Sequence, residues 1–270
     1  MGRMPFSGFI ALLLWVILAV ASGCSREVVV AEDVQPALAM SIDDALANHE
    51  RPAADHEDDL LRKPAAVLAF VGVESGDTIF EIEAGTGYYT ELLSKIVGPS
   101  GTVLMQNPQS FGAFVDDELA VRLADNRLAN VRRLISNFDA LEADNQSVDI
   151  VTWLLGPHEL YFRPPGVDTL GDVERSYAEI YRILKPGGSF VVLDHVAPAG
   201  TPESSGNDLH RIDPAIVKEL ARAAGFKLID ESDVLANPDD QYDIGVFDTA
   251  VRRTTDRFLL KFQKPVNQNS

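Results

Sequence analysis

The chain has 270 residues, of which 46% are hydrophobic and 24% charged, so it can bury a full core and is not expected to be disordered. Its formal net charge of −18 argues against a nucleic-acid-binding protein, because a surface that holds phosphates needs clustered lysine and arginine. The same charge disfavours an anionic membrane surface and is typical of a solvated exterior. We expect one catalytic-sized domain behind a leader.

The first 23 residues have the outline of a bacterial secretory signal. One charge, Arg3, precedes the apolar run 9–21, which is shorter than the ~20 apolar residues that a membrane-spanning helix needs. Small residues then stand directly before Cys24, the single cysteine, in a pattern that resembles the lipobox of bacterial lipoproteins. We therefore predict a signal peptide over 1–23 and an exported lipoprotein that faces the periplasm and is held at the membrane by a lipidated Cys24. An uncleaved N-terminal anchor is the alternative.

Residues 24–50 mix small and acidic residues without an apolar period and are predicted to be a tether. A helical pattern of apolar residues begins near residue 52 and closes near Gly72, so the folded domain is expected over 51–270. Arg51, His56 and Arg62 lie in or beside this helical extension. They could reach a ligand, although a solvated helix face is the commoner place for each of them.

The run 79–90, IFEIEAGTGYYT, is predicted to be a buried strand that stops on a carboxylate, turns through two glycines and enters a helix. Gly85 and Gly87 allow a tight turn and bring the backbone close to a ligand with no Cβ in the way. Glu81 stands near the carboxyl end of the strand, where open α/β sheets bind their ligands. A dinucleotide fingerprint would require glycine at Thr90, so a hydride-transferring enzyme is disfavoured.

The acid and the two glycines, Glu81, Gly85 and Gly87, resemble the first motif of class I S-adenosylmethionine-dependent methyltransferases, which usually carries a third glycine where this chain has Glu83. The resemblance implies a doubly wound α/β domain with a seven-stranded, mostly parallel, Rossmann-like sheet. It also implies S-adenosylmethionine as the methyl donor, bound by the three motif residues and Tyr88.

The elements after the glycine turn follow the order of that fold. Helices are predicted over 88–97, 116–130, 176–184 and 214–224, and strands over 102–106, 131–135, 148–155, 189–196, 227–233 and 257–264. The last strand is expected to run antiparallel and close the sheet. The Lys-Pro-Gly-Gly sequence at 185–188 is predicted to reverse the chain sharply into the fifth strand.

Two further cofactor contacts are implied by the resemblance. The family places an acid against the ribose hydroxyls at the tip of the second strand, where this chain offers Asn107, whose amide oxygen accepts one such bond. Asp139 is the candidate for the adenine amino group, with Phe138 or Leu141 against the ring. A plain turn at Asn107 and a turn-capping aspartate at Asp139 are the alternatives.

The central strand 148–155 runs into the sequence GPHELYF, and in the family the end of this strand faces the transferred methyl group. His158 and Glu159 are therefore the candidate catalytic pair, because an acceptor oxygen or nitrogen can need its proton removed as it attacks. His195 closes the fifth strand at the same crevice and joins them as a candidate. A core or turn histidine without a catalytic role is the alternative for His158.

Segments such as EAGTGYYTELL, ILKPGG, DHVAPAG and LHRID look like those of a group of exported bacterial predicted methyltransferases. The function that this resemblance implies is methyl transfer to an unknown small-molecule acceptor. The alternative is a non-catalytic exported lipoprotein that binds a nucleoside-like or other small ligand in a degenerate pocket. A metal-assisted hydrolase using His158, Asp194, His195 and His210 is a weaker third hypothesis, and no metal is predicted, because their spacing is too long for a metal motif.

Overall fold

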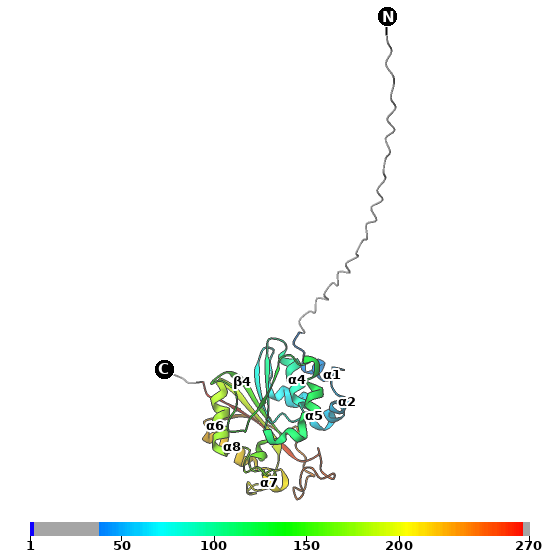
Figure 1. The fold of residues 1–270 in the computed structure, drawn as a ribbon. Coiled ribbons are helices and arrows are strands. Elements are labelled where there is room, and N and C mark those ends of the chain that lie inside the picture. The colour runs from blue at the N-terminus through cyan, green and yellow to red at the C-terminus, as the bar shows by residue number, and fades with distance from the viewer. Residues whose placement is uncertain (3–37, 267–270) are drawn as a thin grey trace. The chain divides into compact units, whose positions relative to one another are not determined.

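The computed structural model describes residues 1–2 and 38–266. Its fold is built on a seven-stranded sheet with the strand order β3-β2-β1-β4-β5-β7-β6 (Figure 1). The pairs β1/β2, β2/β3, β1/β4 and β4/β5 are parallel, and β7 is antiparallel to both of its neighbours. The predicted fold class and the closing antiparallel strand are thus confirmed. Cys24, most of the predicted leader and the tether up to residue 37 lie outside the described residues.

After an all-helical start, strands and helices mostly alternate along the described chain, except that β4 follows β3 and β7 follows β6 directly. In chain order they are α1 (Ile42–Ala47), α2 (Ala53–Arg62), α3 (Pro64–Val71), β1 (Thr78–Ile82), α4 (Tyr88–Val97), β2 (Thr102–Asn107), η1 (Gln109–Phe111), α5 (Gly112–Arg122), η2 (Ala124–Asn126), β3 (Val131–Ile135), β4 (Val148–Leu154), η3 (Pro157–Leu160), α6 (Val173–Ile183), β5 (Leu184–His195), α7 (Ser205–Leu209), α8 (Pro214–Ala223), β6 (Lys227–Ser232) and β7 (Arg257–Gln263). None of the helices in the described ranges has the length and apolar character that a membrane crossing requires.

Helices cover both faces of the sheet, as Figure 1 shows. Ile79 of β1 packs on one face with apolar residues of α1, α3 and α4. Phe80, its neighbour, packs on the other face with residues of α6 and α8. Because both faces are buried, strands β1 and β4 consist of nearly continuous apolar runs, which is why their positions could be predicted well.

Two predicted helices differ from the structure. The helical pattern expected from residue 52 to 72 breaks at Lys63, whose left-handed backbone (φ 46°) separates α2 from α3. Pro64 explains the break, because a residue before proline is disfavoured in the right-handed helical region. The helix predicted over 116–130 begins at Gly112 and ends at Arg122, and a short 3₁₀ turn follows it.

The reversal into the fifth strand also differs from the prediction. Strand β5 begins at Leu184, before the glycines, and its partner register jumps from Val148↔Leu184 to Ile150↔Ser189. The Lys-Pro-Gly-Gly segment is therefore an irregularity within the strand. Gly188 is needed there, because a Cβ would lie 2.8 Å from the carbonyl oxygen of Asp149.

The predicted end of the tether at residue 50 is too late, because residues 38–48 are part of the folded unit. Met40 donates its backbone N–H to the carbonyl of Lys95 (2.9 Å), and a Cβ on Gly98 would lie 2.7 Å from Ala39. The Ser41 hydroxyl then caps α1, accepting a hydrogen bond from the third residue of that helix. A capping serine before a short acidic helix predicts that helix only weakly. The packing of the helix on α4 adds to its stability.

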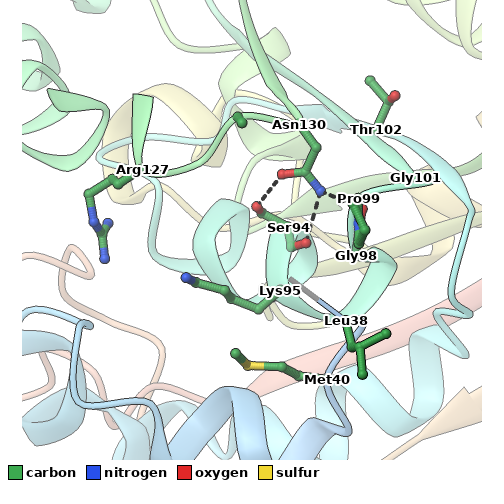
Figure 2. Close-up of a pocket in the computed structure, with 11 residues that line it drawn as sticks. Leu38, Met40, Ser94, Lys95, Gly98, Pro99, Gly101, Thr102, Arg127 and Asn130 are labelled. Carbon is green, nitrogen blue, oxygen red and sulfur yellow. Dashed lines mark hydrogen bonds between the residues drawn. The ribbon is translucent and has the colours of Figure 1, made fainter. Parts of the chain in front are cut away.

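Figure 2 shows this docked segment beside a cavity of about 400 Å³, with Leu38 and Met40 next to the end of α4. Asn130 closes its far side, donating to the carbonyl oxygens of Ser94 (2.9 Å) and Gly98 (2.8 Å). The cavity lies at the start of β2, that is, at the amino ends of the parallel strands. It is therefore at the opposite edge of the sheet from the glycine turn.

A buried arginine joins the glycine turn to three helices. Arg122, at the end of α5 and only 6% exposed, donates from Nε to the carbonyl of Thr86 in the turn (2.6 Å). Its Nη1 atom donates to Asp55 of α2 (2.8 Å) and to Glu91 of α4 (2.7 Å). Arg127 adds a second cation to Glu91. Because these charges lie in a region of low dielectric, each depends on its partners for compensation.

The carboxyl group of Glu81 is also buried, near the carboxyl end of β1. It is 3% exposed and accepts a hydrogen bond from the Thr90 hydroxyl (2.5 Å). Burial raises the pKa of Glu81 to about 8, against the opposing effects of this hydrogen bond and of the Arg122 charge. The side chain is therefore mainly neutral below that pH.

We expect Arg122→Met to lower the free energy of unfolding by about 3–5 kcal/mol, because Asp55 and Glu91 would remain buried with less compensation. Urea unfolding at pH 7, followed by circular dichroism, measures this loss. Arg222→Met is the control, since Arg222 is an exposed residue of α8 that pairs with a carboxylate three residues earlier. A loss no larger than that of the control would show that Arg127 compensates these carboxylates alone.

Glu81→Gln is expected to remove a pH-dependent loss of stability. A carboxyl whose pKa is raised from 4.5 to about 8 stabilises the fold fully below pH 4.5, and this contribution is lost as the pH rises to 8. The wild-type free energy of unfolding should thus fall by a few kcal/mol relative to that of Glu81→Gln over this range. Urea titrations of both proteins at several pH values measure the difference, and a constant difference would contradict the assignment.

Candidate active site

The carboxyl ends of β1, β4 and β5 meet at one edge of the sheet and bring the predicted site residues together. The register pairs Ile82 with Trp153 and Trp153 with Val192, so the three strands end side by side. The glycine turn leaves β1, the segment with His158 and Glu159 leaves β4, and β5 ends at His195. This is the edge at which open α/β sheets bind ligands.

The glycine turn forms the floor of a cleft of about 180 Å³, lined by the turn itself, Arg62, Tyr88 and the end of β4. Gly85 has a left-handed backbone (φ 58°), and a Cβ there would meet no atom within 4 Å, so this glycine faces open space. Gly87 (φ 86°) serves a different purpose, because a Cβ there would lie 2.8 Å from Cδ of Arg122. The first glycine permits approach by a ligand, and the second permits close packing.

Asn107 lies beside the turn, as predicted, but its amide is already engaged. Its Oδ1 accepts the backbone N–H of Gly85 (2.9 Å), and its Nδ2 donates to the carbonyl of the same residue (3.0 Å). The side chain is buried at the end of β2. Its observed role is therefore to fix the conformation of the turn.

Tyr88 begins α4 and lines the cleft, as predicted. Its hydroxyl donates to Asp59 of α2 (2.5 Å), and the guanidinium of Arg62 lies 4.5 Å from the ring centroid. Of the three polar residues predicted near the mouth, only Arg62 lines the cleft. Arg51 is buried in a two-point pair with Asp59, and His56 lies beside the same carboxylate with its side chain 39% exposed.

Helix α2 contacts the rest of the domain through its charged side. Asp55 and Asp58 are buried, whereas Leu60 is 81% exposed. Asp55 pairs with Arg122, and Asp58 pairs with Arg253. The helix that supplies Arg62 to the cleft is therefore held by ion pairs more than by apolar contact.

The residues predicted to contact adenine are not among those that line the cleft. The carboxylate of Asp139 lies 3.7 Å from the guanidinium of Arg175, an exposed residue of α6. Phe138 is fully buried, with its ring 4.9 Å from that of Trp153, and Leu141 is buried in the same core cluster. Both side chains are buried in the core beneath this end of the strands, and a contact of either with a ligand ring stays a prediction.

Glu83 connects the glycine turn with a second, polar part of the site. It has a left-handed backbone (φ 53°), which costs a non-glycine residue roughly 1–2 kcal/mol. The indole N–H of Trp153 donates to its carboxylate (3.1 Å), and Gly156 leaves the space that this carboxylate occupies. Burial, together with the nearby charge of Glu159, raises the pKa of Glu83 well above its usual value.

His158 is held from two sides by Asp194 of β5. Asp194 accepts the backbone N–H of His158 (2.8 Å) through one oxygen and contacts its Nδ1 (2.7 Å) through the other. The Nε2 atom of the same ring lies 3.2 Å from Oε1 of Glu159. Burial opposes the imidazolium, but the two carboxylates dominate and raise the pKa of His158 to about 10.

His210 completes this group from the end of α7. Its Nδ1 atom lies 3.3 Å from Nε2 of His158 and 3.3 Å from Oε1 of Glu159. Although burial opposes ionisation, the two histidines lower the pKa of Glu159 to about 2. His210 and Glu159 therefore belong to one buried polar cluster together with His158, Asp194 and Glu83.

His195 stands apart from these contacts. Its Nδ1 atom lies 2.7 Å from the Thr255 hydroxyl, and its ring centroid is 6.0 Å from that of His158. Burial, followed by the charge of His158, lowers the pKa of His195 well below its usual value. The structure thus brings together two of the three predicted catalytic residues and places the third as a neutral neighbour.

Sequence reasoning missed several residues of the site. Asp194 was named only as a candidate of the hydrolase hypothesis, and its contact with His158 was not predicted. Arg122 and Thr255 had none, because they reach the site from distant segments of the chain.

Comparison with known proteins agrees with this geometry. The model of the ubiE/COQ5 methyltransferase family matches residues 57–232. The Ubiquinone/menaquinone biosynthesis C-methyltransferase UbiE of Marinomonas sp. (strain MWYL1) is 27% identical over 186 residues, which cover 66% of each chain. The UbiE of Klebsiella pneumoniae subsp. pneumoniae is 24% identical over 192 residues, or 70% of this chain and 71% of that one. The match thus spans about two thirds of the length of such relatives.

Solved structures share the fold. A SAM dependent methyltransferase from Aquifex aeolicus superposes with a TM-score of 0.56 at 18% identity, covering 83% of this chain and 99% of that one. The [4+2]-cyclase SpnF superposes with a TM-score of 0.55 at 20% identity, covering 83% and 92%.

The segment matched by the family model contains the glycine turn, the pair His158 and Glu159, and His210. The seven-stranded sheet has the architecture of the superposed methyltransferase. The chain belongs to the ubiE/COQ5 methyltransferase family.

Proposed function

We propose that this chain transfers the methyl group of S-adenosylmethionine to a small acceptor bound at the carboxyl edge of the sheet. One observation carries the proposal: the glycine turn after β1 and the polar cluster after β4 lie at the ends of adjacent parallel strands, bridged by Glu83 and Trp153. A cofactor site and a site for acceptor chemistry are thus neighbours. Methyl transfer depends mainly on orientation and exclusion of water, and buried neighbouring sites provide both.

The residues of the turn fit a nucleoside cofactor. Gly85 faces open space, and Glu81 and Tyr88 are among the residues that line the same cleft. The cleft volume of about 180 Å³ lies below the ~300–1,000 Å³ of typical ligand pockets. We infer that the side chains of Arg62 and Tyr88, on the α2 side of the cleft, move when the cofactor enters.

The polar cluster is suited to an acceptor with an acidic hydroxyl. The Oε2 atom of Glu159 is buried without a hydrogen-bond partner and is available to accept a bond from such a group. Phe162 and Phe247 lie 4.7 Å and 4.9 Å from the ring of His210, measured between centroids, and supply apolar surface beside it. The relatives are named as C-methyltransferases of ubiquinone/menaquinone biosynthesis, and a hydroxylated ring is the acceptor class that we propose here.

One observation favours a second candidate, binding of a nucleoside-like ligand without methyl transfer. Asn107 carries no charge, and both of its amide atoms are engaged by Gly85. A shared fold does not decide between the two functions, since one superposed structure is named as a cyclase.

We also propose that the protein is exported and anchored by a lipid on Cys24. The support is the sequence alone: the apolar run 9–21, followed by small residues before the single cysteine.

Gly85→Ala should weaken the binding of S-adenosylmethionine at least about tenfold, because the new methyl group would project into the cleft. Gly76→Ala is the matched control: Gly76 also has a positive φ (92°), but it lies at the amino end of β1, away from the cleft. Isothermal titration with S-adenosylmethionine and S-adenosylhomocysteine measures both affinities. If the wild type binds neither compound, the proposed function fails; binding without product formation on hydroxylated ring acceptors would favour the second candidate.

Cys24→Ala should move the protein from the membrane fraction to the soluble fraction, because the attachment point of the lipid is lost. Fractionation of cells that express the wild type and the variant, followed by immunoblotting, checks this. Retention of the variant in the membrane fraction would instead indicate an uncleaved anchor.

A further inference from the structure

Three ligating atoms converge in the polar cluster, and in the described part of the chain no other group of this kind is found. Nε2 of His158, Oε1 of Glu159 and Nδ1 of His210 form a triangle with sides of 3.2, 3.3 and 3.3 Å. His158 and Glu159 are buried, and the side chain of His210 is 15% exposed. The triangle therefore lies almost entirely out of water.

Both rings of the triangle face the same carboxylate oxygen, Oε1 of Glu159. Asp194 contacts Nδ1 of His158 and is suited to accept its proton, so Nε2 is the atom that this ring directs at the triangle, and an ion bound there would replace the proton on Nε2. In addition, Oε2 of Glu159 is buried with no partner.

The dimensions of the triangle are those of a zinc site. Zinc binds histidine nitrogen at about 2.0–2.1 Å and carboxylate oxygen at about 2.0–2.2 Å in tetrahedral geometry, which places neighbouring ligand atoms roughly 3.3–3.5 Å apart. We propose that His158, Glu159 and His210 bind a divalent transition metal ion of the zinc type, one ion per chain. Two imidazoles and one carboxylate form a donor set that zinc accepts readily.

The surroundings favour a cation at this position. Asp194 fixes the ring of His158 through the nitrogen that faces away from the triangle, which is the usual partner of a metal-binding histidine. Asp194 also adds a fully buried carboxyl group next to His158. Arg211, next to His210, is already paired with Asp240 (2.8 Å) and does not neutralise the cluster.

Three protein ligands leave one tetrahedral position for water or for an oxygen of the acceptor. The ion would therefore orient a hydroxylated acceptor by binding one of its oxygens, a contact that the glycine turn does not provide. Binding of the ion requires neither S-adenosylmethionine nor an acceptor, so the site can be tested independently of methyl transfer.

The test uses the full-length chain, purified in detergent, freed of metal with a chelator and titrated calorimetrically with Zn²⁺ at fixed pH. We expect one Zn²⁺ per chain and a loss of affinity of at least about 100-fold in both Glu159→Gln and His210→Gln, because each removes a direct ligand. Asp194→Asn should keep the stoichiometry and weaken binding about 10–100-fold, as expected for a positioning residue. His56→Gln is the matched control, since His56 lies beside a carboxylate on α2, and it should bind like the wild type.

Two further measurements distinguish the loss of a metal ligand from poor folding of a variant. Zn²⁺ should raise the Tm of the wild type and of His56→Gln, and it should not raise that of His210→Gln. Co²⁺ bound to the wild type should give the strong visible absorption of a four-coordinate ion, which Glu159→Gln should lose. Absence of Zn²⁺ binding by the wild type, or equal affinities for the wild type, Glu159→Gln and His210→Gln, would overturn the proposal.

Discussion

The contacts of Arg122 fix the conformation on which the site depends. Its guanidinium binds the carbonyl of Thr86 inside the glycine turn and carboxylates of α2 and α4, so one buried cation sets the position of the turn relative to both helices. Gly87 must be glycine because this side chain passes so close to it. The constraint is electrostatic as well as steric: a buried charge tolerates little change in the distances to its partners. The turn is thus held by Arg122 through the carbonyl of Thr86 and by Asn107 through the backbone of Gly85.

The site has two halves with different physical character. The half around the glycine turn is formed by the backbone of the turn on one side and by Arg62 and Tyr88 on the other. The other half is a buried cluster of carboxyl and imidazole groups, where desolvation and close charges shift the pKa values strongly in both directions. Glu83 joins them, since it stands in the turn and its carboxylate reaches Trp153 on the next strand. Its departure from the family glycine is therefore accommodated by space that Gly156 provides.

The sequence was informative where one physical effect dominates. Strands buried on both faces appear as apolar runs, and a turn that needs positive φ appears as glycine, so the sheet and the glycine turn could be predicted, whereas the choice of the pair at 158 and 159 came from the family resemblance. Other features depend on contacts between distant segments. Arg122 looks like any polar residue at a helix end, and Phe138 looks equally suited to a ligand ring or to the core. The helix at 42–47 is short and owes its stability to packing on α4, which local propensity does not reveal.

Helix α2 has a consequence for the environment in which the cleft opens. Its buried face carries Asp55 and Asp58, while Leu60 is exposed to water. The helix is thus held to the domain by ion pairs in place of the usual apolar packing. Dissolved ions screen such pairs, most strongly where solvent reaches them, whereas apolar contacts in the sheet core are not screened in this way. Lys63, with its left-handed backbone, separates this helix from the more firmly packed α3. Salt therefore acts mainly on the pair of Asp58 with the half-exposed Arg253, whereas the buried pair of Asp55 with Arg122 is screened much less.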